Sequence, residues 1–324
     1  MDYIMLLLGL ALLLAGANYL VDSSVAIAQK AKVSNFIIGL TIVGMGTSAP
    51  ELFVSVSSAL TGHGDIAIGN VLGSNIGNIL LILGATAVIL PFSIEKEQQR
   101  RDIPVCIGSM ILLTLLANDA LLPGITVNEI SRLDGTMLLF AFLIYMCYVI
   151  VQKAKRPEES LAEANESTST TLGGKKPWLL WSIAVASLAA LVGGGQLFLN
   201  SAQSLATQWG ISQAVISITV VAIGTSLPEL ITSVVAACKK NPQLALGNII
   251  GSCVFNSLFI TGTASVISPI KVTSVRVSDY VMAIVAAAMC YLVTYTFKRK
   301  TFDRIEGVIF LVVYAAYTAS LLLR

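Results

Sequence analysis

Two glutamates stand in the same short phrase, about half the chain apart. Residues 46–52 read Gly-Thr-Ser-Ala-Pro-Glu-Leu, and residues 224–230 read Gly-Thr-Ser-Leu-Pro-Glu-Leu. Both phrases lie inside long apolar segments, where a carboxylate is costly and marks a functional site. Hydrogen bonding between helices would account for one buried glutamate. The matching Thr, Ser and Pro around Glu51 and Glu229 instead predict one site built from two halves of the chain.

Each phrase also places a proline beside its glutamate. Pro50 has no N–H and its ring clashes with the preceding turn, so we expect the carbonyls of Gly44–Gly46 to lose their helical partners. A bound cation can satisfy such groups inside a bilayer. Thr47 and Ser48 lie four and three residues before Glu51, so their hydroxyls are expected to share a face with its carboxylate. The second copy supplies the corresponding groups, which are Ala222, Thr225, Ser226 and Glu229.

A polar stripe follows each phrase. Asparagine, serine and asparagine recur at every fourth residue and therefore line one face of a helix. The two sets are Asn70, Ser74 and Asn78, and Asn248, Ser252 and Asn256. The small residues Gly69, Gly73 and Gly77 form a ridge that predicts close helix approach. Phe255 stands where the second copy would carry a counterpart of Gly77, so this packing is not expected to be symmetric.

These residues offer oxygen ligands only: two carboxylates, hydroxyls, amide oxygens and freed carbonyls. Such a set suits hard cations such as Ca²⁺ or Na⁺ rather than zinc or copper. Two carboxylates balance the charge of one Ca²⁺. Left empty they would repel each other and hold protons more tightly, so protons are expected to compete with the cation. No Ser/His pair, paired aspartates or His-Glu-x-x-His phrase indicates an enzyme, and no cofactor motif is present.

The elements that must position these groups are predicted to be membrane helices. The chain has 324 residues, of which 56% are hydrophobic and 12% charged, and its mean hydropathy is +0.83. This composition is typical of an all-α polytopic membrane protein, and the net charge of +2 does not indicate nucleic acid. Stretches of about 20 apolar residues can cross a bilayer. We predict ten such spans, at about 3–28, 35–60, 66–91, 103–118, 132–151, 178–206, 212–237, 244–268, 279–297 and 305–323.

Lys and Arg predict the orientation of these spans. With both termini outside, 16 of the 20 basic residues fall on the cytoplasmic side, and the other four are Arg132, Lys271, Arg276 and Arg324. Basic residues concentrate in cytoplasmic loops of membrane proteins. We therefore predict an N-out, C-out protein of the cell membrane, embedded in its lipid bilayer.

The first half of the chain is repeated in the second. A shift of 178 residues aligns the two glutamate phrases and the two polar stripes, and a shift of 172 aligns Arg132–Gly135 with Arg304–Gly307. We predict a five-helix repeat at 1–151 with its signature at 39–80, a cytoplasmic linker at 152–177, and a second repeat at 178–324 with its signature at 217–258. Because five is odd, the second repeat is inverted, as in many secondary transporters.

The paired phrases resemble the two α-repeats of the sodium/calcium exchanger family, within the cation/calcium exchanger superfamily, and the short linker is similar to the compact prokaryotic type. The resemblance implies exchange of Na⁺ for Ca²⁺ by alternating access, in which the first and sixth spans slide across a fixed bundle. It implies a calcium site at Glu51, Glu229, Thr47 and Thr225. It implies flanking sodium sites at Ser48, Ser74, Ser226 and Ser252, with carbonyls near Gly44 and Ala222.

Three alternatives remain open. Asn78 and Asn256 are amides, whereas potassium-dependent relatives carry an acid at the second position, so the resemblance disfavours K⁺ as a substrate. Proton/calcium exchangers usually show Gly-Asn-x-x-Glu instead of the present phrase, which favours Na⁺ over H⁺ as the driving ion for Ca²⁺ or another divalent cation. An ion channel is disfavoured because the repeat builds one two-fold site per chain rather than a ring.

Overall fold

The computed structural model describes residues 2–119, 128–155, 172–209, 224–296 and 300–323, and these are mostly helical. The helices of the first half are α1 (Asp2–Ala31), α2 (Asn35–Ile38), α3 (Gly44–Thr47), α4 (Ala49–Leu60), α5 (Gly64–Ile76), α6 (Gly84–Ile89), α7 (Ile103–Leu116) and α8 (Arg132–Lys155). Those of the second half are α10 (Pro177–Gln208), α13 (Leu227–Cys238), α14 (Pro242–Val254), α15 (Thr261–Ile267), α16 (Val277–Val293) and α17 (Arg304–Leu322).

Short π-helical segments join several of these helices into longer runs. They are η1 (Gly39–Val43), η2 (Gly77–Leu83), η3 (Gln98–Asp102) and η6 (Phe255–Ile260). Asn78 and Asn256 lie within η2 and η6, at corresponding places in the two halves. Such widened turns commonly occur at functional sites.

Six described helices or continuous runs are long and apolar enough to cross a membrane, and the run from 35 to 60 makes a seventh if its bend of 45° is allowed. The six are Asp2–Ala31, Gly64–Ile89, Arg132–Val151, Pro177–Gln208, Pro242–Ile267 and Arg304–Leu321. Helices α7, α13 and α16 are shorter. The span predicted at 212–237 lies largely outside the described residues, which resume at Gly224.

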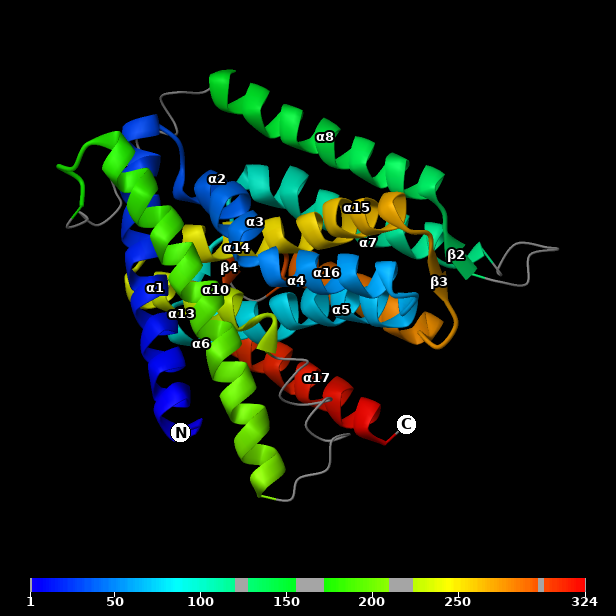
Figure 1. Cartoon of the computed structure of the whole chain (residues 1–324). Helices are drawn as coiled ribbons and strands as arrows, with labels where there is room; N and C mark the ends of the chain where they lie inside the picture. The colour runs from blue at the N-terminus through cyan, green and yellow to red at the C-terminus, as the bar shows by residue number, and fades with distance from the viewer. Residues whose placement is uncertain (1, 120–127, 156–171, 210–223, 297–299, 324) are drawn as a thin grey trace.

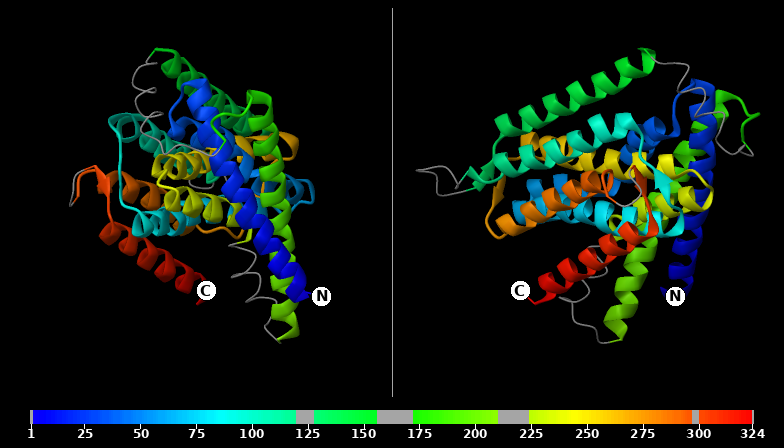
Figure 2. Two further views of the ribbon diagram at one scale, coloured as in Figure 1. Left: turned by 90° about the vertical axis from the view of Figure 1, so that its left-hand side faces the viewer. Right: turned by 180° about the vertical axis from the view of Figure 1, so that it is seen from behind.

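The two longest helices, α1 and α10, run side by side across the rest of the protein (Figures 1 and 2). Glycines allow this close contact. A Cβ atom at Gly9 would lie 2.6 Å from the backbone nitrogen of Phe198, and one at Gly194 would lie 2.9 Å from that of Leu13. Small residues of this kind let membrane helices approach to backbone contact.

The remaining helices form a central layer with α8 along one side and α17 along the opposite side (Figure 1). Helix α8 crosses α15 where a Cβ at Gly135 would lie 2.8 Å from the carbonyl oxygen of Gly262. Helix α17 crosses α6 where a Cβ at Gly307 would lie 2.8 Å from the carbonyl oxygen of Gly84. The glycine of each Arg-x-acid-Gly phrase therefore serves the same purpose in both halves.

Two short antiparallel ribbons connect the halves. Strand β1 (Phe92–Ser93) pairs with β4 (Thr301–Phe302), and β2 (Asn128–Ile130) pairs with β3 (Ile270–Val272). Each ribbon takes one strand from each half of the chain.

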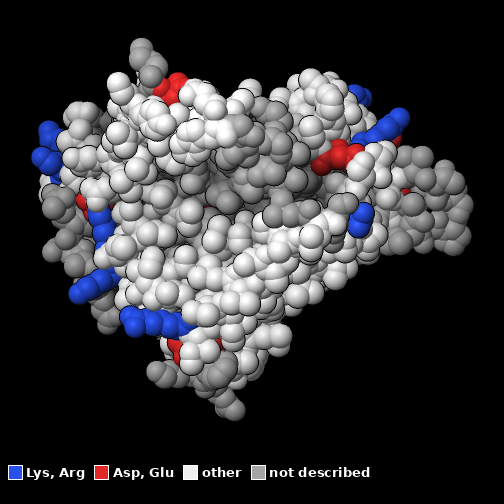
Figure 3. Space-filling model, turned by 90° about the horizontal axis from the view of Figure 1, so that it is seen from below, with Lys and Arg blue, Asp and Glu red and all other residues white. Residues whose placement is uncertain are grey.

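The surface seen from below in Figure 3 carries its charged side chains at the margins, with a broad uncharged area between them. Large apolar side chains on the outer helices are exposed, among them Leu7, Phe140 and Val312. An apolar belt between charged margins is the surface that a lipid bilayer covers.

Candidate cation-binding site

Glu51 and Glu229 are completely buried, and each lies in the first turn of a helix. Prolines at the starts of α4 and α13 favour a helix beginning at these places. The N-terminal end of a helix carries partial positive charge, which stabilises a nearby carboxylate. The repeated Pro-Glu phrase thus brings both carboxylates into equivalent local settings.

Each carboxylate is bonded by a serine from the other half of the chain. Ser48 donates to Oε1 of Glu229 at 2.9 Å, and Ser226 donates to Oε1 of Glu51 at 3.2 Å. The carboxylate that Ser48 bonds is thus the one of the other half, not that of its neighbour Glu51. Because the chain bends between α3 and α4 at Ser48, this hydroxyl reaches across to the opposite carboxylate.

Two asparagines hold the backbone behind the carboxylates. The side-chain amide of Asn70 donates to the main-chain oxygen of Glu51 at 3.2 Å, and that of Asn248 donates to the main-chain oxygen of Glu229 at 3.4 Å. The same amides donate to Ser55 at 3.0 Å and Ser233 at 2.9 Å. These two serines are part of the site that motif analysis missed, although the shift of 178 aligns them.

The threonines complete this network from the opposite half. Thr47 donates to Oδ1 of Asn248 at 3.2 Å, and Thr225 donates to Oδ1 of Asn70 at 3.5 Å. Thr47 is fully buried. The structure thus brings Thr47, Thr225 and the asparagines that support both glutamates into one network.

The predicted free carbonyl at Gly44 is not free. Its oxygen accepts a helical hydrogen bond from the backbone of Ser48 at 3.2 Å and another from the hydroxyl of Ser252 at 3.1 Å. Pro50 lies in the first turn of α4, and the helical bond that it cannot donate would run to the carbonyl oxygen of Gly46. Ser74 lies 3.5 Å from Oε1 of Glu51, and Ala222 lies outside the described residues.

Several polar atoms at the site are buried without a hydrogen-bond partner among the described residues. They are Oε2 of Glu51, Oε2 of Glu229, both side-chain polar atoms of Asn78 and Oδ1 of Asn256. An unsatisfied buried polar atom costs about 1–3 kcal/mol. Four of these five atoms are oxygens, so a bound cation would remove much of this cost.

Asn256 is positioned by a contact that the repeat does not duplicate. Its amide donates to Oδ1 of Asn75 at 3.2 Å, and Asn75 in turn donates to Ser257 at 2.8 Å. The shift of 178 places Cys253 and Ile79 at the matching positions, so motif comparison contained no signal for this pair.

The charge at the site comes from the two glutamates. Neither forms an ion pair with any described residue, and the described residues contain no cluster of three His, Cys, Asp or Glu side chains suited to a metal ion. A cation here must therefore be completed by hydroxyl, amide and carbonyl oxygens, as hard cations prefer. A cavity of about 10 Å³, lined by Ser226, Gly73 and Gly77 among others, lies beside the site and is the size of one water molecule.

The glycines of the two polar helix faces have different described neighbours. No described atom lies within 4 Å of a Cβ built at Gly69, Gly73 or Gly77. In contrast, a Cβ at Gly247 or Gly251 would collide with the backbone of α2 and η1 at residues 36 and 40. Residues 214 and 218, which the shift of 178 aligns with 36 and 40, lie outside the described residues.

The fold and this buried oxygen site define a multi-pass membrane protein of the transporter class. The family model for sodium/calcium exchanger proteins matches residues 1–151 and 179–323, and the chain belongs to this family. It is 30% identical over 350 residues to the sodium/calcium exchanger MaX1 of Methanosarcina acetivorans, covering 99% of this chain and 98% of that one. It is also 32% identical over 295 residues to the inner membrane protein YrbG of Escherichia coli, covering 89% of this chain and 88% of that one.

A solved structure gives the same result in three dimensions. The sodium-calcium exchanger NCX_Mj, soaked with Na⁺ and Ca²⁺, superposes with a TM-score of 0.82 at 30% identity. The match covers 99% of this chain and 98% of that chain. The resemblance inferred from the two glutamate phrases is thereby confirmed, including its compact type.

Proposed function

We propose that this protein exchanges Na⁺ for Ca²⁺ across the cell membrane at the site shared by its two halves. The observation that carries the proposal is the pair of buried glutamates, each bonded by a serine of the other half and each retaining an unpartnered oxygen. Membership of the exchanger family and the names of its relatives MaX1 and NCX_Mj support this choice of ions.

In this proposal Ca²⁺ binds between Glu51 and Glu229 with Thr47 and Thr225. Na⁺ ions use the flanking oxygens of Ser48, Ser74, Asn78, Ser226, Ser252, Asn256, Gly44 and Ala222. Both kinds of ion need the same carboxylates, so they exclude each other and cross in separate steps. Loss of Ca²⁺ leaves two buried negative charges, which the entering Na⁺ ions neutralise.

The proposed membrane topology is ten spans in two inverted repeats, with both termini outside. Mirrored contacts support the repeat: Ser48 with Glu229 corresponds to Ser226 with Glu51, and the ribbon of β1 and β4 corresponds to that of β3 and β2. Inverted repeats allow one site to open alternately to each side. We propose units at 1–151 and 178–324, joined by a cytoplasmic linker at 152–177.

The test is uptake of ⁴⁵Ca²⁺ into proteoliposomes loaded with Na⁺ and diluted into Na⁺-free buffer. Uptake should require internal Na⁺ and fail in vesicles loaded with K⁺. Glu51→Gln and Glu229→Gln should each abolish it, because one remaining carboxylate cannot balance Ca²⁺, whereas Glu129→Gln in β2 should transport normally. Uptake that follows an imposed pH jump and ignores Na⁺ would instead assign H⁺ coupling, and normal transport by both site variants would refute the site.

A further inference from the structure

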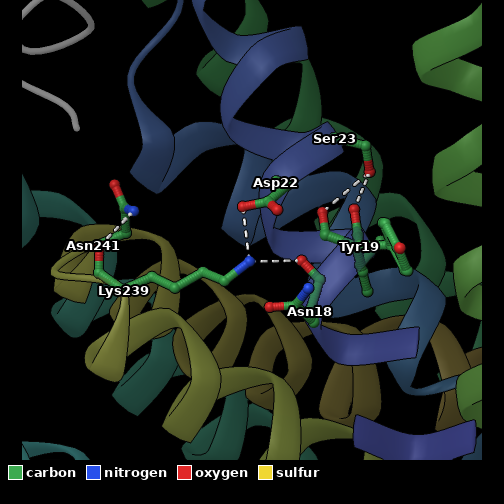
Figure 4. A network of polar contacts seen from close by, with 7 residues as sticks. Asn18, Tyr19, Asp22, Ser23, Lys239 and Asn241 are labelled. Atoms are coloured by element: carbon green, nitrogen blue, oxygen red, sulfur yellow. Dashed lines mark hydrogen bonds and ion pairs between the residues drawn. The ribbon is translucent and has the colours of Figure 1, made fainter. Parts of the chain in front are cut away.

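One ion pair connects the two halves away from the cation site. Lys239, directly after α13, donates from Nζ to Oδ1 of Asp22 at 2.6 Å and to the main-chain oxygen of Asn18 at 2.8 Å, both in α1 (Figure 4). About a quarter of the Lys239 side chain and a fifth of the Asp22 side chain remain exposed. The ammonium is thus held by two oxygens of a helix that belongs to the other half.

The repeat has no counterpart to this ion pair. A shift of 178 maps Gly16 onto Gly194 and Ser23 onto Ser201, and it maps Asp22 onto Asn200 and Lys239 onto Thr61. Neither counterpart is charged, and each bonds within its own helix or turn. Thr61 donates to Ser57 and Ser58, and Asn200 accepts from Gln196.

Helix packing is also closer beside the ion pair than at the equivalent place in the other half. Helix α1 packs along α13, and Leu20, Val21 and Ala28 of α1 are buried in one apolar cluster with Ala236 of α13. The described part of α10 makes no comparable contact with α4, and Asn200 and Thr61 are exposed. In this structure α1 is therefore packed closely on α13 beside Lys239, where the ion pair lies, whereas the described parts of α10 and α4 are not packed closely on each other.

Helices α1 and α10 are tied to each other as one unit. Besides their glycine contacts, Asp2 of α1 accepts hydrogen bonds of 2.6 Å from both Ser204 and Gln208 of α10. A movement of this unit that closed α10 on α4 would draw α1 from α13. It would therefore break the bond between Lys239 and Asp22 without forming an equivalent bond at the other end.

We propose that the Asp22–Lys239 pair is a latch that makes the two access states of the exchanger unequal and favours the one seen here. This inference rests on the proposed alternating access. The latch lies at the end that the proposed topology places in the cytoplasm, so it holds that end closed. Because the pair is absent from the inverted counterpart, the bias comes from these two residues rather than from the shared cation site.

The test measures the access states directly. The exposed Cys147 and Cys238 are first replaced by Ser. Spin labels are then attached at Leu7→Cys in α1 and Phe140→Cys in α8, and pulsed electron–electron double resonance measures the distance between them, which reports the movement of α1. The second access state should appear as a minor population of label distances. Asp22→Asn and Lys239→Met should each raise this population about fivefold, which is the effect expected for the loss of a partly exposed ion pair. The double variant should do no more than either single one, since both remove the same bond.

Three further variants separate a latch from general damage. The swap of Asp22→Lys with Lys239→Asp should restore the parental distribution, and Lys240→Met next to the latch should leave it unchanged. Adding a mirror latch with Asn200→Asp and Thr61→Lys should shift the population toward the second state although the native pair remains. Unchanged distances in Asp22→Asn and Lys239→Met, or no effect of the mirror latch, would overturn the proposal. These distances require no transport, so they are independent of the uptake test.

Discussion

The helix runs 64–89 and 242–267 place the same polar residues at the same steps but are packed differently. In an apolar stretch of 18 residues from each run, 72% of the first and 94% of the second are buried. Gly247 and Gly251 meet the backbone at residues 36 and 40, whereas no described atom lies within 4 Å of a Cβ at Gly69 or Gly73. Residues 214 and 218, the counterparts of residues 36 and 40, lie outside the described residues. Among the described residues, the two runs therefore keep the same polar positions but differ in how much of each run is buried.

The most strongly destabilising substitution in these two runs is expected at a glycine of the second. Gly251→Ala should lower the free energy of unfolding by about 1–3 kcal/mol, because the new methyl group meets the backbone of Leu40, which cannot rotate away. Gly73→Ala is expected to cost less than Gly251→Ala, because no described atom lies within 4 Å of a Cβ at Gly73. Thermal unfolding of the purified variants in one detergent measures both. Equal losses of stability would show that the two runs are packed alike.

The two asparagines that support the glutamates should contribute equally to the site. Asn70→Ala and Asn248→Ala should each weaken the apparent Ca²⁺ affinity about tenfold, since each frees a glutamate backbone and removes the bond that links a threonine of the other half to it. Calcium dependence of uptake measures this, with Asn118→Ala at the end of α7 as a control. An effect of one variant alone would mean that the halves contribute unequally to the site.

The smallest difference is expected at two tyrosines near the edges of the bundle. Tyr145 donates to Asp102 at 3.0 Å in a buried setting, and Tyr317 donates to Asp279 at 3.2 Å where the bond is partly exposed. Tyr145→Phe should cost about 1 kcal/mol and Tyr317→Phe less, because water replaces a lost bond more easily at an exposed place. Denaturation in detergent compares them. A larger loss for Tyr317→Phe would reverse the order that burial predicts.

Much of the candidate site could be predicted because its sequence motif occurs in both halves of the chain. Glu51, Glu229 and the flanking Thr and Ser stood out only when the halves were aligned, since one buried glutamate on its own could simply hydrogen-bond a neighbouring helix. The same alignment contained Ser55 and Ser233, and also Gly84 and Gly262, but common residues outside a phrase gave no reason to select them. Their roles depend on which helices cross, and that is a tertiary property.

Other features could not be predicted from the motifs. Ser48 bonds the opposite glutamate because the chain bends at that residue, and helical spacing assumes that no bend exists. The pair of Asn75 and Ser257 has no repeated counterpart, so comparison of the halves cannot reveal it. Hydropathy identified the six described runs that are long and apolar enough to cross a membrane, whereas their π-helical turns depend on packing that a linear pattern does not contain.

The central claim is that both halves build a single calcium site. Equilibrium Ca²⁺ binding to the purified protein in Na⁺-free buffer, measured by titration calorimetry, tests it most directly. We expect one Ca²⁺ per chain and loss of that binding in Glu51→Gln and in Glu229→Gln alike. Two independent Ca²⁺ ions per chain, with each variant losing only one, would contradict it.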